Sequence, residues 1–177
     1  MRYFIDTEFD WRVDHYLGQA MLRPIGVGIV AEDGREFYGT YCRGLVGATP
    51  FVRDHVLPVA GTRFAGATHV DREFGDKYPP GPVGDEIRAF VGDDVPEFWG
   101  DRTAFDYAVL SMLMGTFADW PTGWPMVVFD LAAMGVEVGP STLPHHALAD
   151  ARAVRDAYEA DLGDGGVWLG QTAVVPT

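Results

Sequence analysis

The sequence predicts an α/β domain built on a mixed β-sheet. Three observations lead to this fold class. The chain begins with an apolar, strand-like run over residues 2–6, and a hairpin pattern follows over residues 21–42. After that, helical patterns alternate with short strand-like runs. Strands that come first, followed by helices mixed with further strands, are typical of a sheet with both antiparallel and parallel neighbours.

The N-terminal part is predicted to be an antiparallel meander of three strands. Residues 2–6, "RYFID", fit a short buried strand. Residues 21–42 fit a hairpin, because two β-rich runs flank Asp33-Gly34, a strong signal for a tight turn. Residues 44–82 are predicted to be a loop-rich insertion, with one short helix within residues 49–58 and a long Gly- and Pro-rich loop over residues 61–82.

The C-terminal part is predicted to alternate between helices and strands. Helices are expected over residues 84–92, 103–115 and 146–163, and strands over residues 95–100 and 125–131.

Two of these helices have a predicted apolar face. For residues 103–115 it consists of Phe105, Val109 and Met112. For the last helix it consists of Leu148, Ala151, Val154 and Tyr158. The tail over residues 164–177 is expected to be loose or to dock through Trp168.

Composition narrows the classes of protein. The 177 residues suit one domain spanning residues 1–177, and 47% apolar residues suit a packed core. A single cysteine, Cys42, fits the reducing cytoplasm, and no signal peptide or membrane span is expected. The net charge of −13 argues against broad adhesion to nucleic acid or membranes. It does not exclude a nuclease, because metal-dependent sites concentrate acids.

Asp6 and Glu8, in "FIDTEF", are the first candidate metal ligands. Alternate side chains of a strand point the same way, so these two acids share one face and Thr7 lies on the other. Hard ions such as Mg²⁺ and Mn²⁺ prefer carboxylate oxygens. However, about one D-x-E is expected by chance in so acidic a chain. A second copy, Asp71 and Glu73, lies in the predicted loop, and the residues alone fit a metal site and a chance pair equally.

Asp106, His145 and Asp150 are further candidates. Asp106 is an acid on the first turns of an otherwise apolar helix; taken alone, it fits a solvent-facing position better than a site. His145 precedes Asp150 by five positions, about 140° apart on a regular helix. The break at Pro144 allows His145 to stand in the loop while Asp150 faces inward. His146 is the adjacent competitor, and spacing favours His145; the alternative is an ordinary residue at a helix N-terminus.

These elements, in this order, resemble the DEDDh 3′-5′ exonuclease family, which has a ribonuclease H-like fold. The family pattern is D-x-E on the first strand, an Asp on a middle helix and H-x-x-x-x-D at the start of the last helix. Here the corresponding stretches are "FIDTEF", "AFDYAVL" and "HHALADA". The stretches "GVGIVAEDGREFY", "VRDHVLP" and "PEFW" look like the small polyadenylate-specific 3′-exoribonuclease AS group of actinobacteria and their phages.

The resemblance implies an activity and a role for each matching residue. Asp6, Glu8, Asp106 and Asp150 would hold two Mg²⁺ or Mn²⁺ ions, and His145 would be the general base. The substrate would be the single-stranded 3′ end of RNA, hydrolysed to nucleoside 5′-monophosphates. Two features depart from many relatives: "GDR" replaces an Asn-containing stretch before the middle Asp, and the loop over residues 61–82 is longer.

Phe9 and Trp11 are candidate substrate-binding residues. Both could stack on the terminal base, and the equal alternative is a core position for Phe9 and an exposed loop position for Trp11. Relatives of the AS group tend to be homodimers, and residues near Trp120, Trp124 and Trp168 suit either an interface or the core.

Three other functions compete with an exoribonuclease. The same chemistry on DNA would make a 3′-5′ exodeoxyribonuclease. A non-catalytic nucleic-acid-binding module on the same fold would be expected to lack some of the acids, and all are present. An acidic mimic of nucleic acid would bind a basic partner and would not need His145 beside the last motif.

Overall fold

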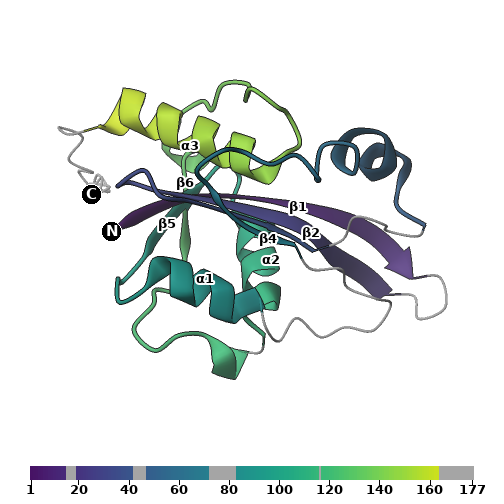
Figure 1. The fold of residues 1–177 in the computed structure, drawn as a ribbon, viewed down its shortest axis with the longest axis horizontal. Coiled ribbons are helices and arrows are strands. Elements are labelled where there is room, and N and C mark those ends of the chain that lie inside the picture. Colours follow the sequence, from purple (N-terminus) through teal and green to yellow (C-terminus); the bar gives the residue numbers. More distant parts are fainter. Residues whose placement is uncertain (15–18, 42–46, 72–82, 116, 164–177) are drawn as a thin grey trace, which may run out of the picture.

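A computed structural model describes residues 1–14, 19–41, 47–71, 83–115 and 117–163 of the chain (Figure 1). The tail over residues 164–177, with Trp168, lies outside the described residues. Neither the expectation that it is loose nor the expectation that it docks is therefore addressed. No helix in the described ranges is long and apolar enough to cross a membrane.

A six-stranded mixed sheet forms the centre of the protein. Its strands are β1 (Arg2–Asp14), β2 (Gln19–Ala31), β3 (Glu36–Thr40), β4 (Thr68–Asp71), β5 (Glu97–Gly100) and β6 (Val128–Asp130). They lie in the order β4-β3-β2-β1-β5-β6. The pairs β1–β2 and β2–β3 are antiparallel, whereas β3–β4, β1–β5 and β5–β6 are parallel. The predicted α/β fold with a mixed sheet is confirmed, and the arrangement is consistent with a ribonuclease H-like fold.

Helices cover both faces of this sheet. The α-helices are α1 (Val83–Val91), α2 (Ala104–Met114) and α3 (Ala147–Leu162). The shorter helical turns are the π-helical η1 (Val52–Val56) and the 3₁₀ turns η2 (Phe117–Asp119) and η3 (Ala132–Met134). Helix α3 lies on one face of the sheet, and α1 and α2 lie on the other (Figure 1). The predicted helices and the Asp33-Gly34 hairpin turn are confirmed, with Gly34 in the left-handed region at φ 87°.

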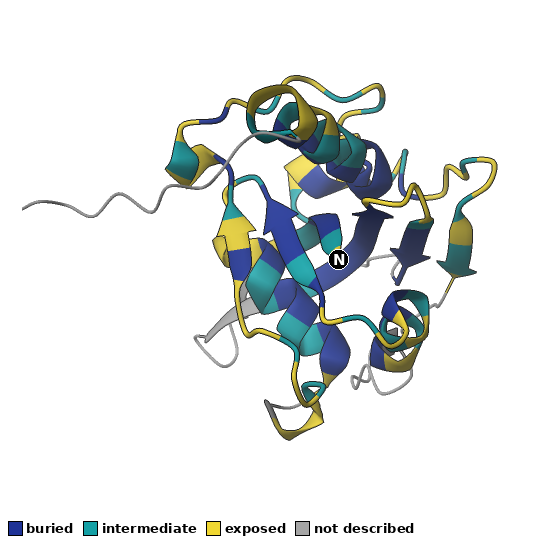
Figure 2. Ribbon diagram, turned by 90° about the vertical axis from the view of Figure 1, so that its left-hand side faces the viewer, coloured by how far each residue is buried: buried dark blue, intermediate teal, exposed yellow. Residues whose placement is uncertain are grey.

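Two apolar layers hold the helices against the sheet. The strands are mostly buried between helices whose outer sides are exposed (Figure 2). The layer on the side of α1 and α2 includes Tyr3, Ile5, Val27, Ile29, Ile87, Val109, Leu110 and Leu113. The layer on the side of α3 includes Phe4, Val30, Tyr38, Leu148, Ala151, Val154 and Tyr158. Neighbouring residues of β1 thus serve opposite layers, as the alternation of a strand requires, and the predicted apolar face of α3 is confirmed.

The prediction of a short first strand is wrong. Strand β1 continues for 13 residues and pairs with β2 as far as Asp14. Asp6 and Glu8 therefore lie in the middle of the strand, not at its end. The register shifts after Glu8, because Glu8 pairs with Gly26 whereas Phe9 pairs with Pro24. Residues 9–14, "FDWRVD", alternate apolar and polar side chains, a strand pattern that the predicted end at Asp6 left out, and pairing with β2 extends over them.

The segment predicted as a loop over residues 61–82 also contains a strand. Residues Thr68–Asp71 form β4, which extends the sheet by pairing in parallel with β3. Asp71, from the second D-x-E, therefore ends an edge strand and forms an ion pair with Arg63. Glu73 lies outside the described residues. The short helix predicted within residues 49–58 is confirmed as η1.

The predicted apolar face of α2 is wrong. Phe105 is 42% exposed and Met112 is half-buried, whereas Asp106, Val109, Leu110 and Leu113 are buried. The solvent-facing position expected for Asp106 taken alone is also wrong, because Asp106 lies on the buried side of α2. Helix α2 is apolar almost all round, so its pattern contains little information about which side meets the sheet.

Trp120 and Trp124, expected either at an interface or in the core, pack against the core. Both side chains are half-buried against the layer of α1 and α2. The Trp120 indole Nε1 donates to the carbonyl of Trp124 at 3.2 Å, and the Trp124 ring lies 5.8 Å from that of Phe98. These contacts favour the core position for the two residues.

Close packing at Gly28 brings α3 against the sheet. A Cβ atom at Gly28 would lie 2.3 Å from the backbone nitrogen of Leu148 and 2.4 Å from the carbonyl oxygen of Ala147. Gly28 is also the partner of Asp6 in the β1–β2 pairing. The absence of a side chain at Gly28 therefore lets the first turn of α3 lie directly beside Asp6.

Substituting Gly28→Ala should destabilise the protein by about 1–3 kcal/mol, because the added methyl group meets the backbone of α3. Urea unfolding followed by circular dichroism measures this change. Gly61→Ala is the matched control, because no atom lies within 4 Å of a Cβ at Gly61. Equal unfolding midpoints for the two variants would contradict the close contact.

Candidate active site

Three carboxylates from two distant parts of the chain meet at one place. Asp6 and Glu8 come from β1, and Asp150 comes from the first turn of α3. One oxygen from each lies within 4.8 Å of the other two. Hard oxygen donors at this spacing fit a divalent cation such as Mg²⁺ or Mn²⁺. We call Asp6, Glu8 and Asp150 the acidic cluster.

The alternation of β1 decides which face each side chain reaches. Asp6 and Glu8 point towards α3, where Asp150 lies. Thr7, between them, points towards α2, and its hydroxyl donates to Oδ1 of Asp106 at 2.6 Å. The prediction that Asp6 and Glu8 share one face of the strand and Thr7 lies on the other is confirmed.

Asp106 approaches the acidic cluster from the opposite face of the sheet. Strand β5 pairs with β1 only over Arg2–Phe4 and ends at Gly100. Helix α2 starts four residues later, so its first turn lies beside the edge of β1 that β5 leaves free. Asp106 is 5% exposed, and its charge acts on both Asp6 and Glu8. All four predicted acids are therefore gathered around this free edge.

Burial raises the pKa values of these four acids, and for Asp6 and Glu8 repulsion by the other acids of the site raises them further. Burial raises the pKa of Glu8 to about 8, with the charges of Asp150 and Asp106 adding to the effect. Burial also raises the pKa of Asp106 to about 7, although the hydrogen bond from Thr7 opposes this. The pKa of Asp6 is raised well above its usual range by burial and then by Asp106 and Glu8. The pKa of Asp150 is raised by burial. Negative charge at this site therefore requires a compensating cation or proton.

Asp10, the next acid on the same face of β1, is already neutralised by the protein. It forms an ion pair with Arg23, and its Oδ1 accepts a hydrogen bond of 2.8 Å from the Thr49 hydroxyl. Burial alone would raise the pKa of Asp10, but the contacts with Arg23 and Thr49 hold it below its usual value. Asp10 is therefore a structural link between β1 and the segment before η1, not a candidate ligand.

His145 and His146 have different environments. His146 is fully buried; its Nε2 lies 3.0 Å from the carbonyl oxygen of Thr62, and its ring packs on Tyr38 at 4.2 Å. Burial lowers the pKa of His146. His145 is half-buried, has a left-handed backbone with φ 65°, and lies close enough to Asp150 for the imidazole to favour the ionised carboxylate. These environments favour His145 over His146 as a reactive group.

Phe9 and Trp11 form an aromatic surface with Phe105 of α2. The ring of Phe105 lies 5.2 Å from that of Phe9 and 5.0 Å from that of Trp11. Phe9 is half-buried against the core, whereas Trp11 is 49% exposed. Trp11 belongs to β1, so the alternative that placed it in a loop is wrong. Phe105 was expected in the core and instead extends this surface.

Sequence reasoning placed Thr7 on the opposite face but gave no role in the site to Thr7 or Gly28, which both shape it. A hydroxyl between two acids of a strand is one signal, because it must point to the opposite face. A glycine within a strand is another, because it often marks a close approach of backbone. The partners, Asp106 and Leu148, are distant in the sequence and could not be named from it.

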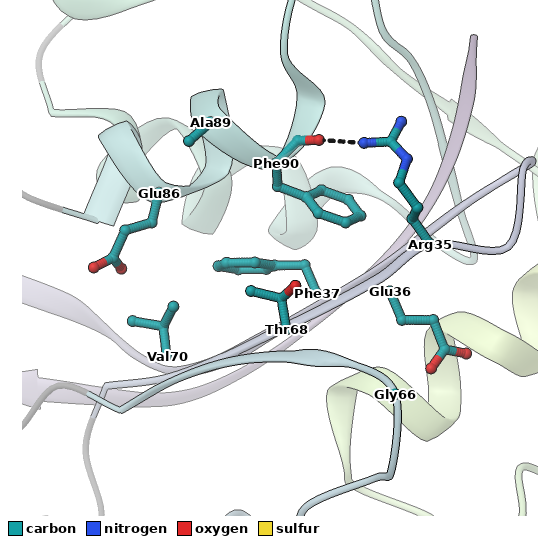
Figure 3. A pocket seen from close by; sticks show the side chains of 9 residues that line it. All are labelled: Arg35, Glu36, Phe37, Gly66, Thr68, Val70, Glu86, Ala89 and Phe90. Carbon is teal, nitrogen blue, oxygen red and sulfur yellow. Dashed lines mark hydrogen bonds between the residues drawn. The ribbon is translucent and has the colours of Figure 1, made fainter.

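A hollow of about 450 Å³ lies elsewhere, between β3, β4 and α1 (Figure 3). Its floor is formed by the rings of Phe37 and Phe90, 5.5 Å apart. Arg35 lies over the Phe90 ring and donates to the Phe90 carbonyl at 2.6 Å. None of the predicted site residues lines this hollow. The acidic cluster, where charges converge, is therefore the better candidate site.

Comparison with known proteins finds relatives over most of the chain. The protein is an α/β domain whose mixed sheet is consistent with a ribonuclease H-like fold, and its four gathered acids form a candidate metal site. No protein-family model matches the sequence. The chain is similar to two proteins named 3′-5′ exoribonuclease, from two strains of Mycobacterium tuberculosis. Each is 29% identical over 163 residues, which cover 86% of this chain and 88% of the relative. This similarity supports assignment to a family of 3′-5′ exoribonucleases.

The metal-free protein should lose stability as the pH rises from about 4.5 to about 8. The pKa of Glu8 rises from 4.5 to about 8 on folding, so in this window the folded state binds more protons than the unfolded state. The free energy of unfolding therefore falls as the pH increases. Glu8→Gln should reduce this loss by at least about 1 kcal/mol.

Urea unfolding in EDTA at pH 5 and pH 8 measures the effect. Asp161→Asn is the control, since Asp161 is an exposed acid near the other end of α3 and should leave the pH dependence unchanged. A wild-type stability that does not fall between these pH values would contradict the repulsion among the acids.

Removing the Thr7 hydroxyl should weaken cation binding at the acidic cluster. Thr7→Val keeps the shape of the side chain but loses the hydrogen bond to Asp106, so the affinity for Mn²⁺ should fall about tenfold or more. Thr7→Ser keeps the hydroxyl and should bind nearly as tightly as wild type. Isothermal titration with Mn²⁺ compares the three proteins, and equal affinities would rule out an orienting role for Thr7.

Proposed function

We propose that this protein is a metal-dependent 3′-5′ exoribonuclease that hydrolyses single-stranded RNA or 3′ overhangs to nucleoside 5′-monophosphates. The observation that carries the proposal is the convergence of Asp6, Glu8 and Asp150, with Asp106 beside them. Its support from other proteins is the similarity, over most of the chain, to relatives named 3′-5′ exoribonuclease. The order of the motifs further favours the DEDDh family and, within it, the AS group.

The four carboxylates are the proposed ligands of two divalent ions, Mg²⁺ or Mn²⁺. Their donor chemistry fits hard cations, and burial, with the charges of neighbouring acids, raises the pKa values of Glu8 and Asp106, so a bound cation would stabilise their ionised forms. Asp6 is the proposed shared ligand, because Asp106, Glu8 and Asp150 all act on its carboxylate. Ions bound there would supply Lewis acidity and lower the pKa of the attacking water.

His145 is the proposed general base. Among the described residues its imidazole makes no hydrogen bond, which leaves it free of the kind of restraint that holds His146 there. It takes a proton from the water that attacks the terminal phosphate. The P–O3′ bond breaks, the shortened RNA leaves with a 3′ hydroxyl, and the released nucleoside keeps its 5′ phosphate.

Phe9 and Trp11 are the proposed contacts for bases at the 3′ end. Trp11 exposes about half of its surface, and Phe105 supports it edge-on with an interplanar angle of 85°. Aromatic rings stack on unpaired bases without strong sequence preference, which suits a single-stranded substrate. The phosphate backbone would approach an acidic protein through the bound cations.

RNA is preferred to DNA as the proposed substrate because the two similar proteins are named exoribonucleases. A cytoplasmic location fits the single cysteine, Cys42. A homodimer is proposed from the resemblance to the AS group, and the interface is not assigned.

The purified protein should shorten 3′-single-stranded RNA from its 3′ end in Mg²⁺ or Mn²⁺ and release nucleoside 5′-monophosphates. Asp6→Ala should abolish this activity, because it removes the shared ligand, and His145→Ala should lower kcat by about 10²-fold or more. Gel electrophoresis of end-labelled RNA and chromatography of the products measure both effects.

Asp156→Asn is the control, because Asp156 is an exposed acid of α3 paired with Arg155. It should keep wild-type activity. Activity that persists in excess EDTA would overturn the metal mechanism, and faster degradation of matched DNA would establish a deoxyribonuclease instead. A protein that binds RNA without shortening it would support the non-catalytic module.

A further inference from the structure

We propose that Phe51 is a positioning residue for His145, holding the imidazole in the orientation that a general base needs. The inference rests on the proposed function, in which His145 takes the proton from water. It adds Phe51, the N-cap residue of η1, which lies directly before the stretch "VRDHVLP" and outside the motifs that contain the five candidate catalytic residues.

Ring contacts join η1 to the loop before α3. The rings of Phe51 and His145 lie 5.0 Å apart at an interplanar angle of 83°, an edge-to-face pair. The ring of His55, one turn further along η1, lies 5.0 Å from that of Phe51 and 6.1 Å from that of His145. The rings of Phe51, His55 and His145 thus meet just before the start of α3, the helix that carries Asp150.

The His145 imidazole lacks the restraints that hold its neighbour. His146 is fixed by the carbonyl oxygen of Thr62 and by packing on Tyr38. The His145 ring has no hydrogen bond to a described residue, and its described ring contacts are those with Phe51 and His55. A general base must keep its nitrogen within hydrogen-bond reach of the reacting water. Among the described residues, the contacts with Phe51 and His55 are the ring contacts that can restrain this imidazole.

The segment that presents Phe51 is itself firmly held. Val52 and Val56 are buried with Ile25 of β2, which fixes the inner side of η1 on the sheet. Just before η1, the Thr49 hydroxyl donates to Asp10 of β1. Phe51 is nevertheless 54% exposed, so it contributes little to this packing. The exposed Phe51 ring, attached to a segment that is packed on the sheet, is therefore suited to restrain the His145 side chain.

Phe51→Ala should lower kcat on RNA by about threefold to tenfold, the loss expected for one edge-to-face contact, and leave KM almost unchanged. Phe51→Trp should restore kcat because it restores a ring, whereas Phe51→Leu should not. Phe129→Ala is the matched control: Phe129 is also exposed and stacks on another ring, Trp99, but it belongs to β6 and is not in the site. It should keep the wild-type kcat.

A double variant separates positioning from general damage to the fold. In a His145→Ala background, Phe51→Ala should cause no further loss of kcat, because the ring that it positions is gone. A further loss would show that Phe51 acts elsewhere and would overturn the proposal. A rise in KM with unchanged kcat would make Phe51 a substrate contact and would overturn it equally.

NMR spectroscopy tests the contact without relying on activity. In wild type the Phe51 ring should shift the proton resonances of the His145 imidazole, and Phe51→Ala should return them towards random-coil positions. Unchanged resonances would refute the positioning role even in an active enzyme. If wild type proves inactive on RNA and DNA while these resonances do move, the proposed function fails and the contact between the rings stands.

Discussion

Mutual repulsion among four carboxylates is the constraint around which this protein is arranged. Asp6, Glu8, Asp106 and Asp150 are brought close together and largely out of water, and both effects disfavour their charged forms. The acids do not stabilise the fold; the apolar layers on the two faces of the sheet must hold them in place. Such a site favours cation binding, because a bound cation attracts each carboxylate and offsets the repulsion between them.

The sheet brings acids together from both of its faces. Asp6 and Glu8 point to the α3 side, and Thr7 points to the α2 side and holds Asp106. These groups can meet because β5 ends at Gly100, so that no described strand pairs with the middle of β1 on that edge. Because Gly28 has no side chain, the first turn of α3 packs directly on β2 and brings Asp150 to the other acids. The end of one strand and the absence of one side chain thus decide the geometry of the site.

Neighbouring residues of the same type can differ completely in what surrounds them. His146 is buried among Tyr38, Phe64 and the Thr62 carbonyl, whereas His145 is half-buried beside Phe51 and His55. In the same way, Asp10 is neutralised by Arg23, whereas Asp6, four residues earlier on the same face, is surrounded by acids. The residue type determines which reactions a side chain can take part in, and its surroundings decide which of two residues of the same type is able to react.

Much of the architecture was accessible from the sequence by itself. Local patterns determined the α/β class, the hairpin at Asp33-Gly34 and the buried face of α3, because these depend on turn chemistry and apolar periodicity within one segment. The side-by-side placement of Asp6 and Glu8 also followed from strand geometry alone. The alternation of apolar and polar residues over 9–14 also favours the full length of β1, whereas the tertiary structure decided the presence of β4 and the inward position of Asp106. Strand pairing supplies stability that no single segment shows, and an almost uniformly apolar helix has no preferred inner face until it packs against the sheet.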